Sequence, residues 1–287
     1  MVPAGTSVAV TGTFARMPAA SGDDEVLELL DRTVDAVAAA LDRFADESPE
    51  RWRDGGERAG QYALDLVADR AALDVLDGAV LDGSPVGVLS EESGLRGTDR
   101  PVVVVVDPVD GSTNASRRIP WYACSLAAVD GEGVRASVVA NLATGVRYRA
   151  LRGGGATRDG RRITCSDQGA LSGAVLVLNG YAGAHAGWRQ YRTLGAMALD
   201  LCAVADGTFD GSMDCTVDAI HPWDYLGGLL VLTEAGGHVG DLHDRPLVEL
   251  TTDTRRTLVT AGSAELFAVL LDRRRSMPPG RPAPAAP

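Results

Sequence analysis

Two carboxylates follow directly after an unbroken run of five valines in residues 101–114. The run, Val102–Val106, consists only of β-branched residues, which predicts a strand that is buried on both faces. We expect the strand to end at Asp107, because Pro108 cannot donate a hydrogen bond to a ladder and Asp110 opens an Asp-Gly turn. In open α/β sheets, ligands usually bind at this end of a buried strand.

The next residues, Ser112-Thr113-Asn114, add groups that bind anions. Their hydroxyls and backbone N–H groups fall at the predicted start of a short helix, which is a favourable place for an oxyanion. Carboxylates for a cation and amides for an anion together indicate metal-assisted phosphate chemistry. An ordinary Asp-Pro-x-Asp-Gly loop is the less favoured alternative when this segment is taken alone, and the rest of the chain weighs against it.

A second pair of acidic residues follows another short predicted strand, residues 85–89. This strand leads into Glu91 and Glu92, and it immediately precedes the valine strand in the sequence. Consecutive strands often lie side by side, in which case Glu91 and Asp107 face one cation.

Three further aspartates accompany predicted helices. Asp224 stands at the start of an apolar helix predicted over residues 225–235, where its carboxylate is either a structural cap or a metal ligand. Asp65 and Asp69 lie on an amphipathic helix predicted over residues 64–76. Taken by themselves, they are explained by a solvated helix face.

Composition excludes several classes of function. The chain has 287 residues, is 45% hydrophobic and carries a net charge of -12, which argues against a nucleic-acid polymer or an anionic membrane as partner. All 27 basic residues are arginine, so no mechanism can use a lysine amine. No segment has the pattern of a signal peptide or a membrane span, and we expect a cytoplasmic protein. The scattered cysteines indicate free thiols in a reducing compartment rather than a zinc site: Cys124, Cys165, Cys202 and Cys215.

Hydrophobic periodicity predicts a mixed α/β chain. The expected helices cover residues 23–45, 64–76, 194–205, 225–235 and 264–273, and the expected strands cover 85–89, 102–106, 122–129, 134–139, 145–151, 174–178 and 257–261. A glycine-rich stretch at 153–160 is expected to connect a hairpin, since no Gly-Lys-Ser/Thr follows it. We expect a flexible arm (1–22), an α+β subdomain (23–164), an α/β subdomain (165–275) and a disordered Pro-rich tail (276–287).

Three segments in the same order resemble the signatures of the inositol monophosphatase family. They are Glu91-Glu92-Ser93, the run from Asp107 to Asn114, and Trp223-Asp224 continuing to Gly237. The helix segment that holds Asp65 and Asp69, the glycine-rich hairpin and the segment from Gly195 to Asp200 are also similar to that family, and the likeness covers residues 24–272. The resemblance implies a layered αβαβα sandwich of the sugar-phosphatase type, and commonly a homodimer.

The resemblance also implies a role for individual residues. The first metal is assigned Glu91, Asp107 and the Val109 carbonyl, and the second is assigned Asp107, Asp110 and Asp224. The expected catalytic residues are Glu91, Asp69, which would help to bind a third metal and orient the attacking water, and Ser112, which stands where the family usually has Thr. The expected substrate-binding positions are Gly111, Ser112 and Thr113 as the phosphate cradle, Asp214 as the partner of a substrate hydroxyl, and Ala196.

The activity implied by the resemblance is Mg²⁺-dependent hydrolysis of a small hydroxylated phosphate ester, by direct attack of metal-activated water. It involves two or three Mg²⁺ ions, with Mn²⁺ as a possible substitute and Li⁺ and Ca²⁺ as inhibitors. An inositol, cyclitol or sugar phosphate is the expected substrate. The alternatives are a nucleotide 3′-phosphatase, a histidinol-phosphatase, a fructose-1,6-bisphosphatase, or a catalytically silent homologue that binds a phosphorylated ligand.

The chain departs from the family pattern at several positions around the substrate. Ala196 replaces a small hydroxyl residue, Ala115 replaces an aromatic residue, and the lysine common near the N-terminal motif is absent. No neighbouring arginine can be assigned to the role of that lysine. These differences leave the predicted metal ligands complete and indicate an altered substrate pocket.

Overall fold

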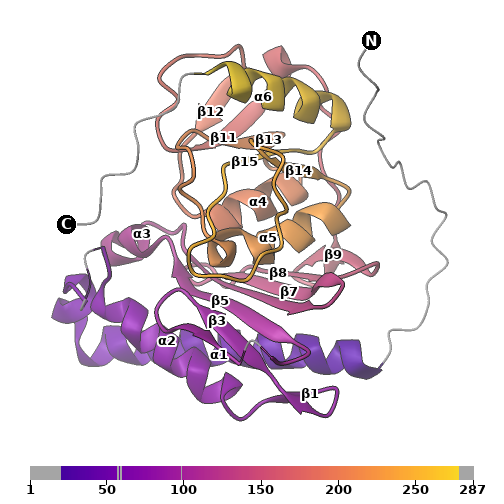
Figure 1. Cartoon of the computed structure of the whole chain (residues 1–287). Coiled ribbons are helices and arrows are strands. Elements are labelled where there is room, and N and C mark those ends of the chain that lie inside the picture. Colours follow the sequence, from indigo (N-terminus) through magenta and orange to yellow (C-terminus); the bar gives the residue numbers. More distant parts are fainter. Residues whose placement is uncertain (1–20, 57, 59, 98, 278–287) are drawn as a thin grey trace.

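The computed structural model describes residues 21–56, 58, 60–97 and 99–277, which form five alternating layers of helix and sheet (Figure 1). Helices α1 (Ser21–Glu47) and α2 (Ala63–Leu76) form the first layer, and α4 (Met197–Ala205) and α5 (Pro222–Glu234) lie between the two large sheets. Helix α6 (Ala264–Ser276) covers the far face of the second sheet. This order confirms the predicted αβαβα sandwich.

The first large sheet has eight strands in the order β10-β9-β8-β7-β6-β5-β3-β4. Their bounds are β3 (Gly87–Ser90), β4 (Gly94–Arg96), β5 (Val103–Asp110), β6 (Ala123–Asp130), β7 (Gly133–Asn141), β8 (Arg147–Leu151), β9 (Gly155–Arg158) and β10 (Arg161–Arg162). Strands β3 and β5 are parallel neighbours, with Ser90 opposite Val106. The expected adjacency of these two strands is therefore confirmed.

Strand β5 extends beyond the end that the sequence predicted. It continues from Asp107 to Asp110, and its pairing with β6 shifts register between these two residues. Such an irregularity turns side chains away from their regular alternation. The predicted hairpin at 153–160 is confirmed, because it joins β8 to β9.

The second large sheet has five strands in the order β12-β11-β13-β15-β14. They are β11 (Val175–Asn179), β12 (Gln190–Arg192), β13 (Gly211–Asp214), β14 (His238–Asp241) and β15 (Leu258–Ala261). The edge strands β12 and β14 were not predicted, because neither is a run of buried apolar residues. Shorter elements complete the described chain: β1 (Val80–Leu81), β2 (Ser84–Pro85), α3 (Ser112–Arg117), η1 (Pro49–Arg53) and η2 (Leu171–Gly173).

Close packing of α5 against its neighbours fixes the position of its first turn. A Cβ added at Gly228 would lie 2.7 Å from the Cβ of Leu201 in α4, and one at Gly227 would lie 2.5 Å from the Oγ of Ser125 in β6. The two glycines therefore let α5 approach both α4 and the first sheet. Because α5 begins at Pro222, this packing also holds Asp224 in place.

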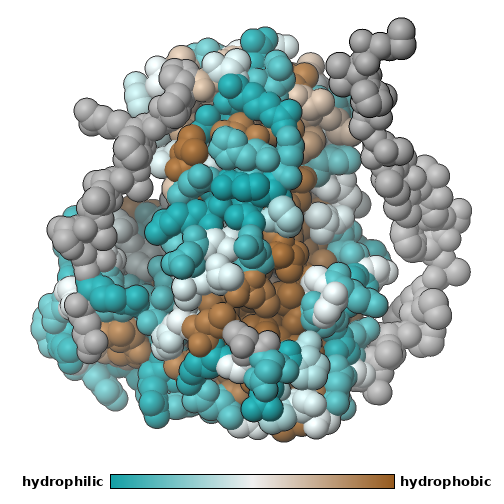
Figure 2. All heavy atoms as spheres, viewed as in Figure 1, coloured by the Kyte–Doolittle hydropathy of each residue, from teal (hydrophilic) through white to brown (hydrophobic). Residues whose placement is uncertain are grey.

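Figure 2 shows a mostly hydrophilic face, with hydrophobic residues gathered in the lower centre. None of the helices in the described ranges is long and apolar enough to cross a membrane. The predicted arm and tail lie outside the described residues, apart from Ser21, Gly22, Ser276 and Met277. The subdomain boundary at 164 stays a prediction.

Candidate metal centre

Three carboxylates from different parts of the chain meet at the end of the parallel strand pair. Glu91 follows β3, Asp107 lies in β5, and Asp224 is the third residue of α5. One oxygen of each lies within 4.8 Å of the others, which allows a single cation to bind between them. This is the one group of three or more potential metal-ligating side chains in the part of the chain that the structure describes.

Asp224 caps its helix and also lies in the group of three carboxylates. Its Oδ2 accepts the backbone N–H of His221 at 2.7 Å, which caps the start of α5. The same carboxylate also belongs to the group of three. The cap holds the side chain in one orientation, so that it faces Glu91 and Asp107.

Asp110 lies beside this group rather than within it. Its two carboxylate oxygens accept the backbone N–H groups of Met197 at 3.1 Å and Ala198 at 2.7 Å, at the start of α4. The charge of Asp110 nevertheless raises the pKa of both Asp107 and Asp224, so the four carboxylates share one environment.

Burial and mutual repulsion disfavour the ionised forms of these acids. Burial, followed by the charge of Asp224, raises the pKa of Glu91 to about 8. Burial, followed by the charge of Asp110, raises the pKa of Asp224 to about 8. The pKa values of Asp107 and Asp110 are also raised well above the ordinary range, again chiefly by burial. Several buried like charges without a neutralising group are costly, and a divalent cation would remove that cost.

The segment after β5 brings a hydroxyl and a carbonyl next to the carboxylates. The Ser112 hydroxyl donates to the Val109 carbonyl at 2.9 Å, and the Val109 N–H donates to Asp107 at 3.0 Å. Gly111 makes the turn between them with a φ of +87°, and a Cβ there would lie 3.1 Å from the Cβ of Ala196. Glycine is therefore required at this position, both for its backbone conformation and for the close approach of the second half of the chain.

Asp65, in the first turn of α2, is the helix acid whose pKa responds to Ser112. Burial raises the pKa of Asp65 to about 6, although the Tyr62 N–H and the Ser112 hydroxyl act to lower it. One oxygen of Asp65 accepts the backbone N–H of Tyr62 at 2.7 Å, and the other is buried and has no hydrogen-bond partner.

Asp69 is one helical turn further along α2 and has a different set of contacts. Its two oxygens accept the hydroxyls of Ser90 and Ser93. Both Asp65 and Asp69 are buried, so the interpretation of a solvated helix face is wrong for both. Asp65 is the third residue of α2, a position at which an acidic side chain often accepts the N–H of the residue before the helix. This position could have identified Asp65 from the sequence as a buried capping residue.

Asp214 ends β13 beside Asn179 of the neighbouring strand. Its Oδ1 accepts the N–H of Thr216 at 3.2 Å and the Asn179 amide at 3.4 Å, while its Oδ2 is buried without a partner. Burial raises the pKa of Asp214 to about 8. Arg274 of α6, which is fully buried, donates to the backbone carbonyl of Asp214 at 2.7 Å.

Two further residues around the site were not singled out from the sequence. Asp200 in α4 is buried, accepts the indole N–H of Trp121 at 2.9 Å, and has its pKa raised by burial to about 8. Arg58 donates to both the carboxylate and the backbone carbonyl of Glu92. Nothing in the sequence distinguished Arg58 from the other arginines of its segment.

Residues 25–276 match the model of the inositol monophosphatase family. The fructose-1,6-bisphosphatase/inositol-1-monophosphatase of Methanothermobacter thermautotrophicus is 32% identical over 248 residues, which are 79% of this chain and 87% of that protein. The Nus factor SuhB of Escherichia coli is 33% identical over 206 residues, which are 66% of this chain and 76% of that protein. A solved inositol monophosphatase from Anabaena aligns with a TM-score of 0.73 at 25% identity, covering 89% of this chain and 97% of that one.

Proposed function

The chain belongs to the inositol monophosphatase family and is a phosphoric monoester hydrolase. We propose that it hydrolyses a small hydroxylated phosphate ester with Mg²⁺ bound among its buried acids. The observation that carries the proposal is the convergence of Glu91, Asp107 and Asp224 within 4.8 Å. An inositol, cyclitol or sugar phosphate is the proposed substrate.

The donor atoms of the site fit a hard divalent cation. Glu91, Asp107, Asp110, Asp224 and the Val109 carbonyl offer only oxygen, which is the donor that Mg²⁺ prefers. The raised pKa of Glu91 and of Asp224 supports the same assignment, because a cation would favour the ionised carboxylates. When bound, the metal would neutralise the negative charge that develops on the phosphoryl group during its transfer.

Asp65 and Ser112 are the proposed residues that position the attacking water and take up its proton. The pKa of Asp65, raised by burial to about 6, suits a group that accepts a proton near neutral pH. One of its oxygens is buried without a partner, and the Ser112 hydroxyl lies beside the carboxylate. In this proposal Asp65 takes the role that the sequence assigned to Asp69, and Asp69 supports the loop after β3.

The remaining site residues are proposed to hold the substrate. The turn at Gly111, Ser112 and Thr113 would bind the phosphate, and the free oxygen of Asp214 would accept a substrate hydroxyl. Ala196 brings only a methyl group to this region, so it would shape the pocket without hydrogen bonding. The number of Mg²⁺ ions, replacement by Mn²⁺, inhibition by Li⁺ and Ca²⁺, the homodimer, the cytoplasmic location and the absence of nucleic-acid and membrane partners stay predictions.

Phosphate release from a panel of esters tests this function. The panel contains inositol 1-phosphate, glucose 6-phosphate, fructose 1,6-bisphosphate, histidinol phosphate and 3′-phosphoadenosine 5′-phosphate, each with Mg²⁺ or with chelator. We expect Mg²⁺-dependent release, which Asp107→Asn lowers by at least about 10³-fold because a shared ligand is lost. Asp77→Asn is the control, since the side chain of Asp77 is largely exposed and pairs with Arg96. No release from any ester would favour the catalytically silent homologue.

A further inference from the structure

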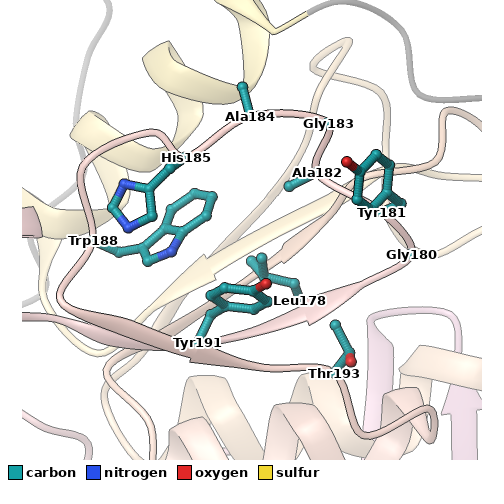
Figure 3. A pocket seen from close by; sticks show the side chains of 10 residues that line it. All are labelled: Leu178, Gly180, Tyr181, Ala182, Gly183, Ala184, His185, Trp188, Tyr191 and Thr193. Atoms are coloured by element: carbon teal, nitrogen blue, oxygen red, sulfur yellow. The ribbon is translucent and has the colours of Figure 1, made fainter.

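A cavity of about 390 Å³ lies between Asp218 and the loop that joins β14 to β15, residues 242–257. Strand β14 ends at Asp241, opposite Leu258 at the start of β15, and β13 runs antiparallel to β15 and ends at Asp214. Asp214 and both ends of the loop therefore lie at the same edge of the second sheet. The larger cavity in Figure 3, below the loop between β11 and β12, lies instead on the sheet face that carries α6.

Backbone pairing connects this loop to the start of α5. The N–H of Arg256 donates to the Ile220 carbonyl at 2.8 Å, and the N–H of Ile220 donates to the Arg256 carbonyl at 3.2 Å, as in an antiparallel ladder. The preceding loop residue, Arg255, therefore lies beside His221, the residue that precedes α5. Asp224 is in the first turn of the same helix, so the pairing brings Arg255 close to the metal centre.

Electrostatic effects confirm that the cavity lies near the acids of the site. Burial, followed by the charge of Arg255, lowers the pKa of His221 to about 4. Burial and the charge of Asp110 raise the pKa of Asp224 to about 8, whereas the His221 N–H and the charge of Arg255 act to lower it. Burial raises the pKa of Asp214 to about 8, and the charge of Asp218 adds to that rise.

Three arginines line the cavity, and two of them already have acidic partners. Arg245 forms an ion pair with Asp218, and the buried Arg256 forms one with Glu249. Arg255 differs from both, because its side chain is exposed and forms no hydrogen bond or ion pair with the residues that the structure describes. The guanidinium of Arg255 is therefore available to a ligand in this cavity.

The charges of the lining favour a carboxylate as the ligand of Arg255. A guanidinium can form two parallel hydrogen bonds with a carboxylate. Asp253, the remaining charged residue of the lining, would repel any anion, and it would repel a doubly charged phosphate more strongly than a singly charged carboxylate. The whole chain carries a net charge of -12, so an anionic group needs a local cation in order to bind.

We propose that Arg255 binds a carboxylate on the alcohol part of the substrate. The inference rests on the proposed phosphatase function and deepens it, because it makes phosphate monoesters of hydroxy acids the preferred substrates. The metal centre would bind the phosphate, Asp214 would accept a hydroxyl of the carbon chain, and Arg255 would bind the carboxylate beyond it.

Matched pairs of esters isolate the contribution of the carboxylate. Gluconate 6-phosphate and glucitol 6-phosphate have the same open six-carbon chain and differ at carbon 1, which is a carboxylate in the first and a hydroxymethyl group in the second. 3-Phosphoglycerate and glycerol 3-phosphate make the same comparison at a shorter reach. We expect kcat/KM to be about 5- to 50-fold higher for the carboxylate member of at least one pair, a range between that of an exposed ion pair and that of a charge-assisted hydrogen bond.

Variants test whether this ratio depends on Arg255. Arg255→Gln should bring the ratio toward one, whereas Arg255→Lys should keep part of it, because the charge remains and the planar fork is lost. Asp253→Asn should increase the ratio, because a repelling charge is removed. Arg161→Gln is the matched control, since Arg161 is an exposed residue of β10, at the opposite end of the first sheet from β3 and β4.

Equilibrium binding separates failure of this inference from failure of the phosphatase function. If no ester releases phosphate, isothermal titration of the same four esters in Mg²⁺ still measures the preference for a carboxylate. Tighter binding of the carboxylate esters that Arg255→Gln abolishes would then reject the phosphatase function alone. A ratio near one for both pairs in the wild-type protein, or a ratio that Arg255→Gln leaves unchanged, would overturn the role of Arg255.

Discussion

Glu91→Gln should have opposite effects on stability with and without Mg²⁺. In metal-free protein, burial and the charge of Asp224 raise the pKa of Glu91 from 4.5 to about 8. A raised pKa in the folded state means that the unfolded chain ionises first, so stability is lost as the pH rises from 4.5 toward 8. The substitution removes this penalty, because the glutamine is neutral in both states.

The size of the effect follows from the same values. At about pH 7.5, which is about 3 pH units above 4.5, the ionisation of Glu91 in the unfolded chain lowers the stability of the wild-type protein by about 4 kcal/mol, because each unit corresponds to about 1.4 kcal/mol. Glu91 keeps part of its surface exposed, and neighbouring acids can share the proton, so we expect about 2 kcal/mol. For a chain of this length, that corresponds to a rise in Tm of about 4–8 °C in chelator.

With Mg²⁺ the wild-type protein should have a higher Tm than Glu91→Gln. At a Mg²⁺ concentration of about 100 times its Kd, the wild-type protein gains about 2.7 kcal/mol, whereas the variant, which lacks one ligand, gains less. The assay is thermal unfolding in chelator and across a Mg²⁺ titration. Glu92→Gln is the matched control, because Glu92 pairs with Arg58 and its neutralisation should lower Tm in both conditions. A Tm for Glu91→Gln below that of the wild type in chelator would refute the reasoning.

Three further predictions concern other buried polar groups. Asp65→Asn should lower kcat by about 10²–10⁴-fold in steady-state kinetics and preserve the Mg²⁺-induced rise in Tm. Asp69→Asn should instead lower the free energy of unfolding by about 1–3 kcal/mol in urea unfolding, with a much smaller change in kcat. Burial raises the pKa of Asp241, but the side chain of Arg245 and backbone N–H groups lower it to about 2 overall. Ionised Asp241 therefore stabilises the folded state above about pH 4, and this stabilisation is lost as the pH falls toward 2. The difference in urea midpoint between the wild type and Asp241→Asn should shrink between about pH 5 and about pH 2.5. Arg274→Met should destabilise the fold by about 2–4 kcal/mol in urea unfolding, because two buried carbonyls lose their donor, and an unchanged midpoint would show that water replaces the guanidinium.

Local sequence patterns were sufficient for the elements that bury a continuous apolar surface. The valine strand, helix α1 and helix α5 have strong periodicity or unbroken apolar runs, and each covers most of its predicted range, although β5 continues to Asp110 and α5 begins earlier, at Pro222. The edge strands β12 and β14 carry no such signal, since their side chains are largely exposed or half-buried. Pairing with a neighbouring strand, rather than their own composition, makes them strands.

The site shows the same division. The sequence by itself determined that two acids would lie near the ends of buried strands, because Glu91 follows β3 and Asp107 follows the valine run of β5. Only the tertiary structure decided that Asp69 accepts hydrogen bonds from the Ser90 and Ser93 hydroxyls, since the docking of α2 against the first sheet sets which turn of the helix faces the loop after β3. Contacts between distant segments depend on how elements pack, and local periodicity carries no information about that packing.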